Sequence, residues 1–163
     1  MMDQISKYFN AEKHESVLFV IIGCIAIVLA CYFFMKVKLP FYTGMAYPFM
    51  LIGIVQITVG STVYVRSPKD ILRVNQIAQT HKQKIQTEEI PRMNLVMKNF
   101  TIYKWIEVAF IVVGVILFIF FQPTTFWKGV GLGMMVQGLF MLVLDFFAES
   151  RGNTYLEFLQ TLN

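Results

Sequence analysis

The chain has 163 residues, of which 56% are apolar, and its formal net charge is +4. Four long apolar segments and their connections use nearly all of this length, which leaves no room for a second, soluble domain, so residues 1–163 are expected to form a single domain. A nucleic-acid partner is not expected, because the sequence contains no known nucleic-acid-binding module and its basic residues are not interleaved with aromatic ones.

The apolar segments differ in length. The two early ones run for 19 and 27 residues without a charge, whereas the apolar runs of the two later ones, 108–121 and 129–144, are only 14 and 16 residues long. A helix that crosses ~30 Å of hydrocarbon needs about 20 residues. The later segments can therefore cross the membrane only if neighbouring residues are included, which places two acids, Glu107 and Asp145, at the membrane boundary. The predicted membrane-spanning helices lie at about 16–35, 44–65, 105–121 and 126–148.

These helices predict an all-α integral membrane protein, with four transmembrane helices in an up-down bundle. Ahead of the first, Ile5, Tyr8 and Phe9 have helical spacing, which predicts a short amphipathic helix on the membrane surface. Gly152 and Asn153 are expected to break the fourth, so that 155–162 forms a second short amphipathic helix.

The connection between the second and third spans contains two helix-start signals. Ser67-Pro68-Lys69-Asp70 combines an N-cap, a proline and an acid, and Thr87-Glu88-Glu89-Ile90-Pro91 repeats the pattern. From Met93 onward the apolar positions keep helical spacing into the third span, so 91–121 is expected to be one helix. The sequence thus predicts a cytoplasmic helical hairpin at about 67–104.

Positive charge is distributed unevenly among the connections. Of fourteen Lys and Arg residues, eight lie between the second and third spans, three flank the termini and three fall in the other two connections. The eight are Arg66, Lys69, Arg73, Lys82, Lys84, Arg92, Lys98 and Lys104. This asymmetry places both termini and the hairpin in the cytoplasm, in a multi-pass protein of the bacterial inner (plasma) membrane.

Acids within spans are a functional hypothesis by default, because they are costly in lipid. Glu107 follows Lys104 by three residues, and Asp145 precedes Arg151 by six, so both acids are expected at similar depth. Either they belong to an ion-paired belt at the membrane boundary, or they bind protons or cations. The predicted boundary cluster consists of Glu107, Asp145, Glu149, Arg66, Lys104 and Arg151, and Glu12, His14 and Glu15 are further candidates from the N-terminal side.

Other polar and small residues within the spans are interpreted as packing features. Gln56 and Gln137 lie near the middle of the second and fourth spans, where an amide seeks a hydrogen-bond partner in another helix. Cys24 and Cys31 are expected to be buried, inert thiols. The glycines expected to allow close helix approach are Gly53, Gly60, Gly129 and Gly133.

No catalytic motif is present: the sequence lacks HExxH, GxSxG and a dinucleotide fingerprint. We therefore expect no enzymatic activity, no catalytic residue, no cofactor and no metal site.

Three segments resemble those of small, four-span bacterial inner-membrane proteins: Glu89-Ile90-Pro91-Arg92-Met93, Lys98-Asn99-Phe100 and Asp145-Phe146-Phe147-Ala148-Glu149-Ser150-Arg151. The resemblance implies a location and no activity.

Two functions remain open at this point. The first is protein–protein interaction, as an accessory or immunity-type binder of a membrane partner or toxin, with the lipid bilayer and either a protein partner or further copies of the chain as its contacts. The alternative is an oligomeric proton- or cation-coupled transporter or channel that uses Glu107 and Asp145.

Overall fold

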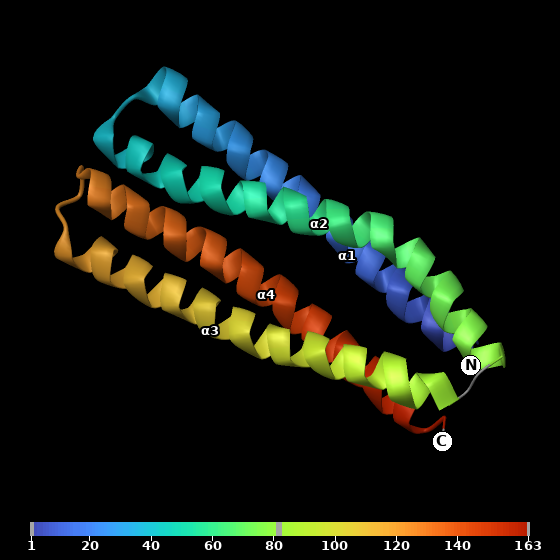
Figure 1. Cartoon of the computed structure of the whole chain (residues 1–163). Helices are drawn as coiled ribbons and strands as arrows, with labels where there is room; N and C mark the ends of the chain where they lie inside the picture. Colours follow the sequence, from blue (N-terminus) through green and yellow to red (C-terminus); the bar gives the residue numbers. More distant parts are fainter. Residues whose placement is uncertain (1, 81–82, 163) are drawn as a thin grey trace.

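The computed structural model describes residues 2–80 and 83–162 (Figure 1), so His81 and Lys82 lie outside the described residues. Within these ranges the chain is helical and contains no strand. All four α-helices are long and apolar enough to cross a membrane, as predicted. The elements in chain order are α1 (Met2–Tyr32), the π-helical turn η1 (Phe33–Val37), α2 (Pro40–Thr80), the π-helical turn η2 (Ile85–Glu89), α3 (Ile90–Phe120) and α4 (Phe126–Gln160).

Each α-helix is longer than a bilayer crossing requires. They contain 31, 41, 31 and 35 residues, whereas about 20 suffice to cross the hydrocarbon. The surplus gathers at one end, where both termini lie beside the connection from α2 to α3 (Figure 1). We call this the charged end, residues 2–15, 66–104 and 149–162. The opposite end, with the connections at 33–39 and 121–125, is the turn end.

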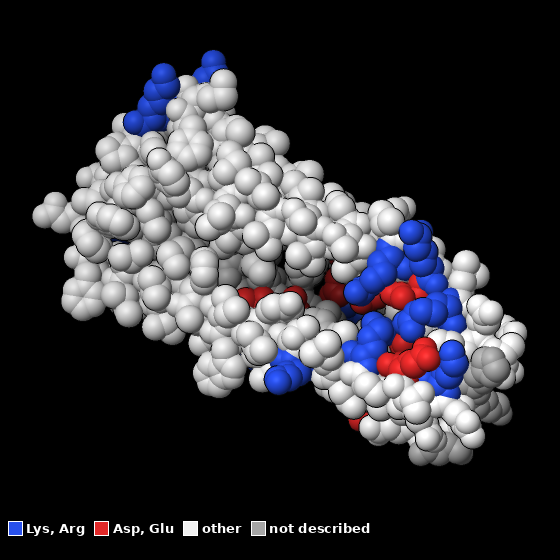
Figure 2. Space-filling model, viewed as in Figure 1, with Lys and Arg blue, Asp and Glu red and all other residues white. Residues whose placement is uncertain are grey.

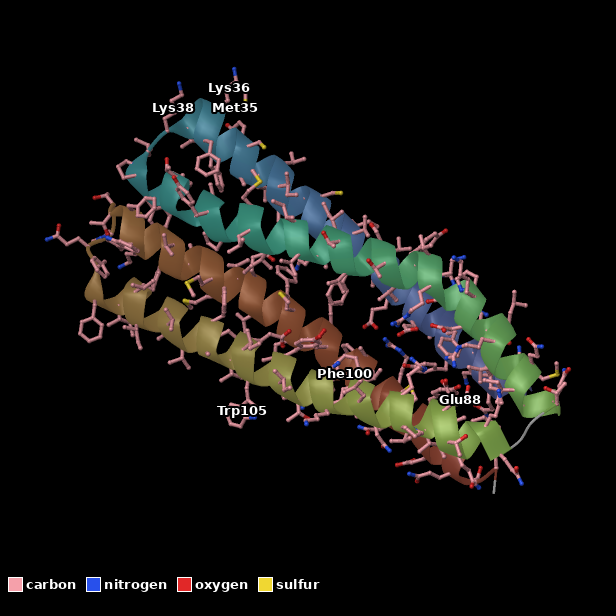
Figure 3. All side chains as sticks on the ribbon, viewed as in Figure 1. Met35, Lys36, Lys38, Glu88, Phe100 and Trp105 are labelled. Atoms are coloured by element: carbon pink, nitrogen blue, oxygen red, sulfur yellow. The ribbon has the colours of Figure 1, made fainter. Side chains whose placement is uncertain are left out.

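Charged side chains mark the two ends differently. A mixed patch of basic and acidic side chains covers the charged end, whereas the middle of the visible face is almost free of them (Figure 2). Lys36 and Lys38 stand at the turn end and Glu88 at the charged end (Figure 3). The chain reverses after η1 at Lys38, whose φ of 52° is the one left-handed value among the described non-glycine residues.

The helices pack as two hairpins, α1 with α2 and α3 with α4, which meet through α2 and α4. A smaller contact joins α1 to α4, and it includes Tyr8 and Tyr155 at the charged end. The order of neighbours across the molecule is therefore α1, α2, α4, α3 (Figure 1). Because α2 and α4 both start at the turn end, the two hairpins are joined by a parallel helix pair.

Glycines allow the closest of these helix contacts. A Cβ added at Gly129 of α4 would overlap the carbonyl oxygen of Phe41 in α2, and one added at Gly44 would overlap that of Phe126. Of the other predicted packing glycines, Gly53 faces α1 at Gly23, Gly60 faces Ser16 of α1, and Gly133 faces Pro48 of α2. All four predicted glycines therefore lie at contacts between helices of the same chain.

A separate apolar core fills the charged end. It draws on all four α-helices and on η2. The helix ends that extend beyond the predicted membrane-spanning segments, which we call the apolar lengths, are therefore packed together. Its buried members are Ile5, Tyr8, Phe9, Val74, Ile77, Ala78, Ile85, Met93, Tyr155 and Leu159.

This core explains why both predicted terminal helices were wrong. α1 continues without a break from Met2 to Tyr32, and α4 passes through Gly152 to Gln160. Ile5 and Phe9 are fully buried in the protein instead of lying on a membrane surface. Gly152 is a contact point, because an added Cβ there would lie 2.8 Å from the Sδ of Met97. Helical spacing of apolar residues predicts an apolar face, but not whether that face meets lipid or protein.

The helix start predicted at Ser67 and Pro68 was also wrong, since α2 is continuous from Pro40 to Thr80. Ser67 does not cap a helix; its Oγ donates to the carbonyl oxygen of Val63 (2.8 Å) one turn earlier. An interior proline removes one amide donor and costs about 3 kcal/mol, which burial of Val74 and Ile77 further along the same helix offsets. Residues 67–80 thus continue α2, η2 follows at Ile85–Glu89, and α3 is unbroken from Ile90 to Phe120.

We predict that Gly129→Ala lowers the apparent midpoint of thermal unfolding in detergent, because backbone atoms of Phe41 have to move; overpacking of this kind costs about 1–3 kcal/mol. The matched control is Gly152→Ala, whose new methyl group meets the flexible end of Met97. Equal midpoints for the two variants would contradict the α2–α4 contact described above.

Candidate functional site

The most completely bonded acid of the charged end is Glu89, whose side chain is 0% exposed. Arg92 donates to both of its oxygens, from a terminal nitrogen to Oε1 (2.6 Å) and from Nε to Oε2 (3.0 Å). Arg73 donates to Oε2 (2.8 Å) and the Tyr155 hydroxyl donates to Oε1 (3.3 Å). Since these donors stand on α2, α3 and α4, one carboxylate ties three helices to η2.

Aromatic rings surround this network. Tyr8 of α1 stacks on Tyr155 at a ring-centroid distance of 4.2 Å, and the Arg92 guanidinium lies 5.7 Å from the centre of the Phe9 ring. Burial raises the pKa of Tyr155, and the neighbouring Glu89 carboxylate raises it further, so the phenol keeps the proton that it donates. Burial alone would lower the pKa of Arg92, but the hydrogen bonds to Glu89 and the negative charge of that carboxylate together outweigh burial and raise it.

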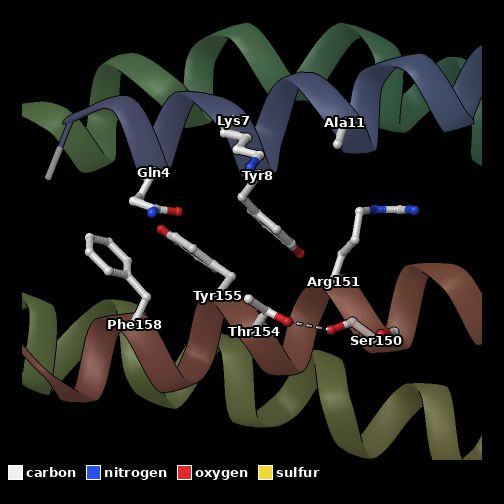
Figure 4. Close-up of a pocket in the computed structure, with 9 residues that line it drawn as sticks. All are labelled: Gln4, Lys7, Tyr8, Ala11, Ser150, Arg151, Thr154, Tyr155 and Phe158. Atoms are coloured by element: carbon white, nitrogen blue, oxygen red, sulfur yellow. Dashed lines mark hydrogen bonds between the residues drawn. The ribbon is translucent and has the colours of Figure 1, made fainter.

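A pocket of about 180 Å³ lies beside these rings, between α1 and α4. Figure 4 shows Tyr8 and Tyr155 extending toward each other from the two helices, with Lys7 and Arg151 on either side of them. The pocket thus combines aromatic faces with two basic side chains.

The ion pairs continue away from Glu89 as a chain of alternating charges. Arg73 also contacts Asp70 (3.3 Å), Asp70 contacts Arg66 (3.2 Å), and Arg66 contacts Glu12 of α1 (3.0 Å). Burial raises the pKa of Glu12, which the positive charge of Arg66 partly opposes. The chain links α1 to α2 as Glu89 links α2 to α3 and α4.

Two further ion pairs stand closer to the apolar lengths. Lys104 of α3 contacts Glu149 of α4 (2.6 Å), and Arg151 of α4 contacts Glu15 of α1. Burial lowers the pKa of Arg151, although nearby acidic groups oppose the shift. Arg66 and Arg151, which we expected to neutralise the acids of the later spans, are therefore committed to Glu12, Asp70 and Glu15.

Glu107 and Asp145 take part in none of the ion pairs among the described residues. Glu107 is 3% exposed, and neither of its carboxyl oxygens has a hydrogen-bond partner there. Its electrostatic neighbours are Asp145 and Lys104. The two acids of the predicted cluster thus lie together, but without the basic partners expected for them.

Gln56 and Gln137, the two amides within the apolar lengths, bond to each other. Nε2 of Gln56 donates to Oε1 of Gln137 (3.2 Å), and both side chains are buried. Oε1 of Gln56 has no partner among the described residues. The bond joins α2 to α4 and so adds a polar link between the two hairpins.

Sequence reasoning missed Glu89, Arg73 and Arg92 as members of the network. Glu89 and Asp70 were interpreted as acids of a first helical turn, and Glu12 and Glu15 only as possible additions. The sequence did contain one indication of the network. More acids and arginines lie on both sides of the α2–α3 connection than two helix starts require. Their pairing needed coordinates, since Glu12 lies 54 residues from Arg66 and Glu15 lies 136 from Arg151.

Comparison with known proteins gives no assignment: no protein-family model, no curated protein and no solved structure matches this chain. In the described ranges no group of three or more His, Cys, Asp or Glu side chains gathers as a metal site. The expectations of no enzymatic activity and no cofactor stay predictions.

We predict that Glu89→Gln destabilises the protein by about 3 kcal/mol, the lower end for breaking a buried ion pair, because Arg73 and Arg92 retain partial access to water. Chemical denaturation in a mild detergent would measure it. The neighbouring Glu88→Gln is the control: Glu88 is 48% exposed and, among the described residues, pairs with the exposed Lys84, so its loss should cost under ~1 kcal/mol. Similar losses in both variants would show that the Glu89 network does not hold the helices together.

Proposed function

We propose that this protein is a multi-pass protein of the bacterial inner membrane that works by binding another protein at its charged end, which faces the cytoplasm. The partner is a membrane protein that it assists, or a membrane-directed toxin that it neutralises. The observation that carries this proposal is the ordered projection itself: helices continue beyond their apolar lengths and pack around a core of their own.

Order in a projecting surface favours binding, because a preorganised surface loses less conformational entropy when a partner docks. The Glu89 network and the stacked rings of Tyr8 and Tyr155 hold this end in one arrangement. The predicted packing glycines are less suited to a partner, since contacts within the chain already occupy them. The excess of basic residues at the charged end supports the cytoplasmic orientation.

Charge at this end favours a partner with an acidic surface. Most of its acids and arginines are paired with each other, whereas the exposed residues Lys7, Lys69 and Lys98 have no ion pair among the described residues. Unpaired surface charge steers association and sets partner choice more than it sets affinity.

We predict that a tagged full-length chain, extracted from its native membrane in mild detergent, retains a protein partner, and that Lys69→Glu/Lys98→Glu reduces recovery about tenfold, which corresponds to ~1.4 kcal/mol. The matched control is Lys36→Glu/Lys38→Glu at the turn end (Figure 3), which should retain the partner. Recovery of no partner by the unmodified chain, or equal loss in both variants, would contradict the proposal.

A second candidate function, proton- or cation-coupled transport by an oligomer, is favoured by one observation, the burial of Glu107 without a hydrogen-bond donor. On this hypothesis, proteoliposomes show a proton or cation flux that Glu107→Gln or Asp145→Asn abolishes, with helix content unchanged by circular dichroism. Glu149→Gln serves as the control, because Glu149 has Lys104 as its partner. The hypothesis fails if the unmodified protein gives no flux above that of empty liposomes.

A further inference from the structure

The acids of this chain fall into two groups, those with an ion-pair partner and those without one among the described residues. Six of the ten form ion pairs among the described residues, and of the remaining four, Asp3 and Glu157 lie near the termini. Glu107 and Asp145 are the other two, and they are the acids inside the predicted membrane-spanning lengths, 105–121 and 126–148. An acid in such a position is expensive unless it is neutralised.

The register of α3 against α4 brings these two acids face to face. The helices are antiparallel, and Lys104 of α3 contacts Glu149 of α4 at 2.6 Å. Residues three or four apart lie on one face of a helix. One turn further from the charged end, Glu107 follows Lys104 and Asp145 precedes Glu149, so the two carboxyl groups lie close enough to interact.

Glu107 differs from the acids of the ionic network at the charged end in its lack of hydrogen-bond donors among the described residues. Glu89 is equally buried but receives donors from Arg73, Arg92 and Tyr155, whereas neither oxygen of Glu107 receives one. Figure 2 shows acidic side chains in a hollow midway along the molecule, apart from the mixed patch at its charged end. A buried carboxylate with no donor is costly, so the environment of Glu107 favours a bound positive charge.

We propose that Glu107 and Asp145 together form a proton-binding site, in which one proton is shared between the two carboxyl groups. Two carboxylates and one proton give a carboxylic acid that donates to the remaining carboxylate, with a net charge of −1; a second proton gives two neutral acids. The site needs no further reactant, and the inference does not depend on partner binding or on ion flux.

The surroundings favour a proton over a metal cation. Mg²⁺ and Ca²⁺ take six or more oxygen ligands, and the described residues contain no third acid, histidine or cysteine at this site. The charged groups that act on the pair are Lys104 of α3 and Glu149 of α4, which are paired with each other. The facing length of α2 carries no charge from 39 to 65, and α1 carries none from 17 to 35.

Infrared difference spectra of the full-length protein in lipid nanodiscs, recorded against pH, test the site through the carboxylic-acid C=O band. Because the two groups share a proton, the unmodified protein should titrate in two steps separated by more than about one pH unit. Glu107→Gln and Asp145→Asn should each leave a single step at a shifted midpoint, and the double variant should leave neither. Glu149→Gln, the matched control, should keep both steps.

The titration is repeated in Na⁺ and in a large organic cation at the same ionic strength. Equal midpoints support a proton site, whereas midpoints that fall as Na⁺ rises overturn it in favour of a metal cation. A wild-type titration equal to the sum of the two single variants also overturns it, because independent acids share no proton. If one variant does not fold, the other still tests the coupling, and the Na⁺ comparison needs no variant.

Discussion

A single buried carboxylate, that of Glu89, determines how the charged end of this protein is arranged. A carboxylate out of water is stable only where donors replace its hydration, and here the donors are Arg73, Arg92 and Tyr155. Because these three donors all bond to Glu89, the end of α2, the start of α3 and the end of α4 meet at one point. The apolar core around Tyr8 and Met93 can close only when these helix ends have met.

The apolar lengths are held together by a different kind of contact. There the hydrophobic effect offers no preference between protein and lipid, so close approach and a few polar bonds determine helix association. Gly44 and Gly129 bring α2 and α4 together, and the bond between Gln56 and Gln137 fixes the same pair of helices further along. Glu107 differs from these amides, because neither of its buried oxygens has a hydrogen-bond donor among the described residues. Structural need alone therefore accounts for Glu89 and not for Glu107.

The candidate site was partly predictable from the sequence, and the reason can be seen in particular residues. The short apolar runs after Glu107 and before Asp145 predict that both acids lie inside membrane-spanning helices, and their spacing from Lys104 and Arg151 predicts a similar depth. The spacing could not predict which acid each basic side chain would pair with. Arg66 has acids within reach on two helices, and its contacts with Glu12 and Asp70 remove it from the later spans.

Four helices apolar enough to span a membrane and the unbroken α3 followed from the sequence alone, because charge-free length and helical period are local properties of a chain. The neighbour order α1, α2, α4, α3, the continuation of α1 and α4 into the charged end, and the partners of Glu89 were decided only by the tertiary structure. Those features depend on which faces meet between residues far apart in sequence, such as Arg151 and Glu15. An amphipathic pattern is the same whether its apolar face contacts lipid or another helix, so only the folded chain could distinguish the two.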